Sequence, residues 1–303
     1  MSRFESLYNL LQREIPDLEL RCNEPMSRHT TFKIGGNADV FIAPHTLDEL
    51  IFCLNVCADN GIPTFILGNG SNLLVSDSGI RGAVINTSAL NSITLNEDGS
   101  ITALCGAKLS ELCRFAQKNS LTGLEFAFGI PGTVGGSIYM NAGAYGGELK
   151  DVVLKVTALN KDNEPVVFTN ADCDFSYRHS VFMQNGFVIL SVDIMLNAGD
   201  KEEIAREMED ILLRRKTKQP LEYPSAGSVF RRPEGYFAGA LIENAGLKGY
   251  GIGGAQVSEK HAGFIINKSN ATCEDVKSLI SHIQKTVYEK DGVELVCEVK
   301  FVG

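Results

Sequence analysis

Residues 68–74 read GNGSNLL, and residues 129–137 read GIPGTVGGS. Both runs combine small polar residues with glycines, which let the backbone approach a ligand closely. The first run follows the apolar segment Ile62–Leu67, which we expect to be a β-strand. It departs from the dinucleotide fingerprint G-x-G-x-x-G, because Leu73 stands at the third glycine and no helix opens after it. Consecutive outward N–H groups in such a turn can still bind a pyrophosphate, and an ordinary β-turn is the alternative.

Glycine is concentrated in two windows of the chain. The 303 residues include 30 glycines, and 17 of these fall within residues 123–147 and 227–263. Such clustering is typical of loops whose N–H groups face an anion or a flat ring. Structural turns are the alternative for each glycine.

The overall composition is that of an ordinary globular protein, with 44% hydrophobic and 21% charged residues. The net charge of −9 argues against general nucleic-acid or anionic-membrane binding. No stretch reaches the ~18 apolar residues that a membrane helix needs. The eight cysteines include no CxxC pair, and the N-terminus has no signal-peptide pattern. We therefore expect reduced thiols, no metal site, no membrane insertion and a cytoplasmic protein.

Hydrophobic periodicity predicts alternating helices and strands. We expect an amphipathic N-terminal helix, a strand at Asp39–Ala43, a helix that begins at the capping box Thr46–Glu49, and helices over 108–119, over 201–218 and from the Thr272–Asp275 capping box to Gly292. Together with Ile62–Leu67, the first of these segments predict a βαβ unit. Alternating apolar residues predict a closing strand at Val293–Val302.

Six segments of the chain resemble, in the same order, those of the UDP-N-acetylenolpyruvoylglucosamine reductase family. They are residues 68–74, 129–137, 141–146, 177–180, 226–230 and 295–301. The resemblance implies an α+β fold: an FAD-binding domain of the vanillyl-alcohol-oxidase/PCMH type, made of two α/β subdomains, and a C-terminal α+β substrate domain. We expect an N-terminal helix and lead-in at 1–27, the FAD domain at 28–197 with subdomains of about 28–85 and 86–197, and the substrate domain at 198–303. The last boundary rests on the polar turn Asn197–Asp200.

The resemblance also implies a reaction. NADPH reduces FAD, and a hydride from FAD N5 reduces the enolpyruvyl group of UDP-N-acetylglucosamine enolpyruvate, giving UDP-N-acetylmuramate for peptidoglycan, the cell wall that supports cell shape and division. Such a reduction needs a hydride source, a clamp for the negative charge of the enolate and a proton donor.

The resemblance assigns FAD contacts to three segments rich in small residues. These contacts are Gly68, Asn69, Gly70, Ser71, Asn72 and Leu73, then Gly129, Pro131, Gly132, Thr133, Gly135, Gly136 and Ser137, and finally Asn141, Ala142 and Gly143.

Three residues are expected to be catalytic by the same resemblance. Arg178 would clamp the enolate, since a guanidinium is planar and always charged. Ser228 would donate the proton, and Glu298 would lie near the enolate. From the residues alone, the alternatives are a surface arginine, a turn serine and a solvent-facing glutamate on an alternating strand.

Substrate contacts are expected at Lys218, which precedes Pro220, at Tyr177, and at Arg231 and Arg232 as candidates for the diphosphate.

The chain resembles the shorter family subclass, because residues 182–187 lead directly to the next strand without the tyrosine-bearing loop of other members. We expect a monomer. There are two competing interpretations. One is another flavoenzyme of the same fold, such as an oxidase of small alcohols, and the other is a non-enzymatic nucleotide-binding module.

Overall fold

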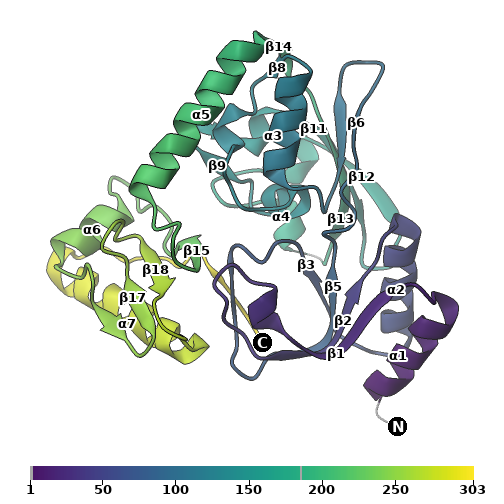
Figure 1. The fold of residues 1–303 in the computed structure, drawn as a ribbon, viewed down its shortest axis with the longest axis horizontal. Coiled ribbons are helices and arrows are strands. Elements are labelled where there is room, and N and C mark those ends of the chain that lie inside the picture. The colour runs from purple at the N-terminus through teal and green to yellow at the C-terminus, as the bar shows by residue number, and fades with distance from the viewer. Residues whose placement is uncertain (1–2, 185) are drawn as a thin grey trace. The chain divides into compact units, whose positions relative to one another are not determined.

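The computed structural model describes residues 3–184 and 186–303, which form two compact units, each made from three segments of chain. The first unit contains Met1–Cys22, Val40–Asn69 and Gly82–Arg214. The second contains Asn23–Asp39, Gly70–Arg81 and Arg215–Gly303. Figure 1 labels the elements along the chain. None of the helices in the described residues is long and apolar enough to cross a membrane.

The first sheet has the strand order β1-β2-β5-β3, from β1 (Glu19–Pro25), β2 (Asn37–Ala43), β5 (Ile80–Asn86) and β3 (Thr64–Leu67). The helices α1 (Arg3–Glu14) and α2 (Leu47–Asp59) contact each other and contribute Leu7, Leu11, Leu50 and Cys53 to the core. The elements of the predicted βαβ unit are all present. However, β5 lies between β2 and β3 and pairs in parallel with β3.

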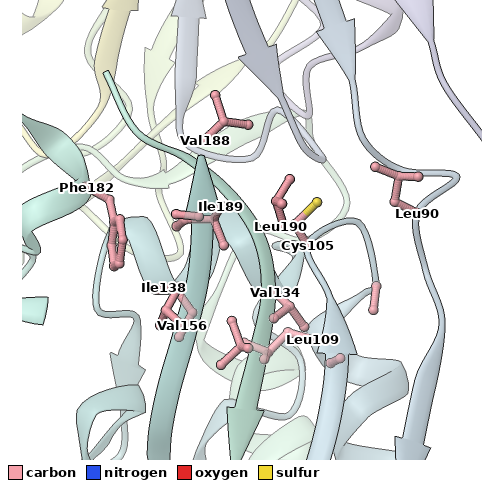
Figure 2. Close-up of a cluster of buried hydrophobic side chains, with 14 of the residues drawn as sticks. Leu90, Cys105, Leu109, Val134, Ile138, Val156, Phe182, Val188, Ile189 and Leu190 are labelled. Carbon is pink, nitrogen blue, oxygen red and sulfur yellow. The ribbon is translucent and has the colours of Figure 1, made fainter. Parts of the chain in front are cut away.

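The second sheet of the first unit is antiparallel, with the order β12-β11-β13-β7-β6. Its strands are β12 (Pro165–Thr169), β11 (Val153–Leu159), β13 (Val188–Ile194), β7 (Ile101–Leu104) and β6 (Ile93–Leu95). Two helices, α3 (Leu109–Lys118) and α4 (Val134–Tyr139), contribute Leu109, Val134 and Ile138 to the hydrophobic core. Figure 2 shows these side chains together with Val156 and Ile189 of the same core. Because α4 contacts both β7 and β13, the buried strands fix the position of the glycine-rich segment that leads into α4.

Helix α5 spans Lys201–Lys218, as the sequence predicts. Its buried residues Ile204 and Met208 belong to the hydrophobic core of the first unit. This packing explains why the first compact unit continues to Arg214, beyond the boundary predicted at residue 197.

The second unit contains the antiparallel sheet β15-β18-β17-β16, formed by β15 (Ser225–Ser228), β18 (Phe264–Asn267), β17 (Ala255–Val257) and β16 (Gly251–Ile252). It also contains α6 (Ala238–Asn244) and α7 (Cys273–Asp291), and α7 contacts β16 and β17 (Figure 1). Phe32, Ile34 and Leu74 are buried in the same core. The second unit therefore includes two segments that the sequence assigns to the lead-in and the FAD domain.

The remaining elements are short. They are the strand pairs β8 (Leu121–Thr122) with β14 (Asn197–Ala198) and β9 (Gly143–Ala144) with β10 (Gly147–Glu148), and the 3-10 helices η1 (Met26–Arg28), η2 (Glu125–Ala127), η3 (Leu149–Asp151), η4 (Ala171–Cys173) and η5 (Val181–Met183).

The predicted closing strand at Val293–Val302 is wrong over most of its length. Only β19 (Lys300–Val302) is a strand, and it pairs in parallel with β4 (Leu73–Val75). Before β19, Cys297 makes a single bridge to Phe230. The alternating hydrophobic residues indicate that one face of this segment is buried. Among the described residues, however, this segment has no continuous partner strand that would extend the β-ladder.

Helix α7 begins and ends at the predicted residues. Thr272 Oγ1 accepts from the Asp275 N–H at 3.0 Å, and Asp275 Oδ2 accepts from the Thr272 N–H at 3.0 Å. Gly292 ends the helix in the left-handed conformation, with φ 67°.

We predict that Thr272→Ala lowers the local unfolding free energy of α7 by about 1 kcal/mol, because a first-turn N–H loses its acceptor. The matched control is Thr286→Ala in the same helix, where the hydroxyl only donates to the His282 carbonyl oxygen and alanine favours the helix. Hydrogen exchange of peptides from the first turn of α7 measures the difference. Equal exchange in the two variants would contradict the role of the cap.

Candidate functional site

The turn that follows β3 has two features that its glycines make possible. At Gly70, where φ is 60°, a Cβ would lie 2.1 Å from the His29 carbonyl oxygen, and the Thr31 N–H donates to the Gly70 oxygen at 3.2 Å. The backbone N–H groups of residues 68–71 donate to no acceptor within the described part of the chain. Four consecutive N–H groups without a protein acceptor are suited to an anion.

The second glycine-rich segment lies against this turn within the first unit. A Cβ on Gly68 would lie 2.4 Å from Thr133 Oγ1, and Asn69 Nδ2 donates to the Pro131 carbonyl oxygen at 2.6 Å. Thr133 also begins α4, since its Oγ1 accepts from the Gly136 N–H at 3.4 Å. The structure therefore brings together the two segments to which the sequence assigns most of the FAD contacts.

The buried hydroxyl of Ser137 in α4 is a second observation that bears on a cofactor. Ser137 is 3% exposed, and its Oγ has no hydrogen-bond partner among the described residues. Leaving such a group unsatisfied costs about 1–3 kcal/mol. A pyrophosphate accepts hydrogen bonds, and a flavin ring carries oxygen and nitrogen atoms at its edge. Within the first unit, the N–H groups of Gly68 and Asn69 and the Ser137 hydroxyl therefore fit FAD.

Arg178 occupies a strained turn in the first unit. Its φ is 54°, and the turn is closed by backbone hydrogen bonds between Ser176 and His179. A left-handed backbone costs a residue with a side chain roughly 1–2 kcal/mol, and such strain is often found at functional sites. The half-buried guanidinium donates to the Gly143 carbonyl oxygen at 3.0 Å and lies 5.0 Å from the centre of the exposed Tyr177 ring.

An aromatic cluster holds the chain after this turn. The rings of Phe168, Phe182 and Phe187 make edge contacts, with centroids between 5.0 and 6.1 Å apart. This is the segment in which the sequence predicts a direct connection to the next strand, and Asn185 within it lies outside the described residues.

In the second unit, backbone contacts bring Ser228 and Glu298 to neighbouring segments. Ser228 is the exposed last residue of β15, and the Val229 carbonyl oxygen next to it accepts from the Glu298 N–H at 2.7 Å. Asn72 links the same segment to the turn at residues 68–71: its side-chain Nδ2 donates to the Glu298 carbonyl oxygen at 3.2 Å, and its backbone carbonyl oxygen accepts from the Lys300 N–H at 2.9 Å.

The side chain of Glu298 is half-buried. Strand alternation alone places it toward solvent, but residues 293–299 do not form a regular strand, so the alternation does not decide which way the side chain faces. Arg178 belongs to the first unit, whereas Ser228 and Glu298 belong to the second, so their joint action stays a prediction.

The cationic residues expected to contact the substrate differ in environment. Arg231 has a buried Nε with no hydrogen-bond partner among the described residues, and its backbone N–H donates to Val296. Arg232 lies 4.0 Å from the centre of the Phe237 ring. Lys218 is exposed at the end of α5, and no described contact links it to either arginine.

One titratable group near Ser228 was not singled out from the sequence. His261 Nδ1 accepts from the Gly263 N–H at 3.1 Å, and the Gly263 carbonyl oxygen accepts from the Val229 N–H at 2.9 Å. Burial lowers the pKa of His261 below its ordinary value. Only the pairing of β15 with β18 brings this histidine near Ser228, and no local sequence signal gives that pairing.

We predict that Gly68→Ala lowers the free energy of unfolding of the FAD-free protein by about 1–3 kcal/mol, because the new Cβ displaces Thr133. Gly136→Ala is the matched control. There a Cβ would meet only Thr133 Oγ1, at 3.5 Å, and alanine favours the helix. Calorimetric unfolding of both variants measures the difference, and a Gly68→Ala protein as stable as the control would contradict the close approach.

Comparison with known proteins identifies both parts of the chain. A model of an FAD binding domain matches residues 38–195, and a model of the C-terminal domain of UDP-N-acetylenolpyruvoylglucosamine reductase matches residues 219–302. These matches confirm the predicted fold class. The exact domain limits stay a prediction.

Similar proteins match over the full length. The chain is 54% identical over 299 residues to the UDP-N-acetylenolpyruvoylglucosamine reductase of Caldanaerobacter subterraneus subsp. tengcongensis, covering 99% of each chain. It is 45% identical over 303 residues to that of Clostridium perfringens, covering 100% of this chain and 99% of the relative. The crystal structure of the reductase from Thermus caldophilus superposes with a TM-score of 0.81 at 32% identity, covering 94% of this chain and 100% of the other. The chain therefore belongs to the UDP-N-acetylenolpyruvoylglucosamine reductase family of FAD-dependent oxidoreductases.

Proposed function

We propose that the protein reduces the enolpyruvyl group of UDP-N-acetylglucosamine enolpyruvate to give UDP-N-acetylmuramate, with NADPH as reductant, in peptidoglycan precursor synthesis. The observation that carries the proposal is the link made by Asn72. This residue ends the turn with free N–H groups and is hydrogen-bonded to the backbone of Glu298. The same segment is hydrogen-bonded to Val229, next to Ser228.

Each proposed role follows from the charge that the reaction creates. FAD, when bound, supplies the hydride that adds to the β-carbon of the enolpyruvyl group. Negative charge then develops on the substrate carboxylate, where the permanent charge of Arg178 stabilises it. The hydroxyl of Ser228 donates the proton to the α-carbon, and Glu298 contributes hydrogen bonding near the enolate.

Arg231 and Arg232 are proposed to bind the diphosphate, and Lys218 and Tyr177 to contact the substrate. The sequence offers no separate NADPH motif, so NADPH and the UDP-sugar would use one site in turn. The proposal also includes membership of the shorter subclass, a monomeric state and a cytoplasmic location.

The purified holoenzyme tests the reaction directly. We expect a yellow protein that NADPH bleaches under anaerobic conditions and that the enolpyruvyl UDP-sugar recolours, with excess UDP-sugar slowing the bleaching competitively. Bleaching without recolouring would contradict the proposed substrate and favour another flavoenzyme of this fold.

The role of Glu298 is tested by two substitutions. We expect Glu298→Gln to retain recolouring, because an amide still offers a hydrogen bond, and Glu298→Ala to lose roughly 100-fold or more in its rate. Stopped-flow absorbance of the flavin measures this step apart from reduction by NADPH. A fully active Glu298→Ala enzyme would remove Glu298 from the mechanism.

A further inference from the structure

The side chain of Asn141 is committed to contacts within the protein. Asn141 is fully buried, and its amide nitrogen donates to Glu148 Oε2 at 3.1 Å and to the Ser176 carbonyl oxygen at 2.9 Å. Its amide oxygen accepts from the Lys150 N–H at 3.0 Å. Both N–H bonds of the amide are therefore used by the protein, although the sequence assigns this residue to the cofactor.

Two further hydrogen bonds join the same two segments of the first unit. The Ser180 hydroxyl donates to the Tyr139 carbonyl oxygen at 2.7 Å, and the Arg178 guanidinium donates to the Gly143 carbonyl oxygen at 3.0 Å. Residues 139–143 thus bind residues 176–180 before, within and after the strained turn. A left-handed arginine persists only where its surroundings determine the conformation in this way.

Glu148 also contacts the side-chain amide of Asn141. Its carboxylate accepts from Asn141 and also pairs with Lys150 Nζ at 2.7 Å. The hydrogen bond from Lys150, together with that from Asn141 and the nearby charge of Arg178, holds the pKa of Glu148 below its usual range. The carboxylate is therefore ionised near neutral pH and is a strong acceptor for the Asn141 amide.

We propose that Asn141 and Glu148 are positioning residues that hold the Arg178 turn in its left-handed conformation, so that the guanidinium is preorganised for the developing enolate. The inference rests on the proposed function, in which Arg178 acts on the substrate. Misplacing a catalytic group by about 1 Å can cost on the order of 100-fold in rate. Since NADPH carries no enolate, reduction of the flavin does not need this positioning.

The experiment measures both half-reactions by stopped-flow absorbance of the FAD-loaded enzyme. Asn141→Asp keeps the size and the acceptor oxygen but removes both donors, and Glu148→Ala removes the partly exposed acceptor. We expect each to slow recolouring by the enolpyruvyl UDP-sugar by about 10–100-fold. Bleaching by NADPH and FAD content should stay near wild type, and Glu148→Gln should restore most of the rate because its amide oxygen still accepts from Asn141.

The matched control is Asn163→Asp. Asn163 also has a left-handed backbone, with φ 58°, and its amide donates to Asn55 on the protein surface. This variant should leave both half-reactions unchanged. Because Asn141→Asp is buried and could fail to fold, Glu148→Ala provides the independent test.

A double substitution separates positioning from general damage. In an Arg178→Ala background, Asn141→Asp or Glu148→Ala should slow recolouring by less than about threefold more, because the group that they position is gone. Wild-type recolouring in both single variants, equal slowing of both half-reactions, or full additivity with Arg178→Ala would overturn the inference. Unchanged recolouring in Arg178→Ala itself would instead refute the proposed clamp, and failure of the wild-type enzyme to recolour would refute the proposed function.

Discussion

The close approach of Gly68 to Thr133 is the contact on which the cofactor-type site depends. A single Cβ at residue 68 would lie 2.4 Å from Thr133 Oγ1, which also caps α4. A side chain at position 68 would therefore force Thr133 to shift where the two segments meet. Among the described residues, the same turn gives the N–H groups of residues 68–71 no protein acceptor, so one backbone geometry produces both the tight packing and a set of N–H groups suited to an anion.

This geometry changes the interpretation of the glycine clusters. From the sequence alone, the glycine clusters are interpreted as ligand contacts, because glycine lets the backbone approach a phosphate or a ring. At Gly68 the structure shows instead a close approach of one protein segment to another, while the neighbouring N–H groups have no acceptor in the part of the chain that the structure describes. A glycine-containing segment therefore marks a close approach of the backbone but does not identify the atoms that a cofactor would contact.

Local signals predicted α1, α2, α3, α5 and α7 but not the short helices α4 and α6, and they did not predict which distant strands pair. Helices α5 and α7 have the predicted bounds or lie within one residue of them, because caps and periodicity act over a few residues. The strand expected at residues 293–302 is present only at Lys300–Val302, because its partner β4, more than 200 residues earlier in the sequence, is itself only three residues long. The same long-range contacts bury Phe32 and Leu74 in the second core, which no composition shift in the sequence indicates.

The same limit applies to the site residues expected from family motifs: a motif gives the residue type but not the distant contacts that hold the residue in place. The motif around Arg178 gives the residue type that a carboxylate requires, but the chain must also hold that residue at a φ of 54°. That constraint comes from Tyr139, Asn141 and Gly143, which lie more than 30 residues earlier and bind the turn through hydrogen bonds. A family motif therefore indicates the residue expected to act, whereas the cost of its conformation indicates that other residues must support it, and Asn141 is a buried residue whose amide makes one of the supporting hydrogen bonds.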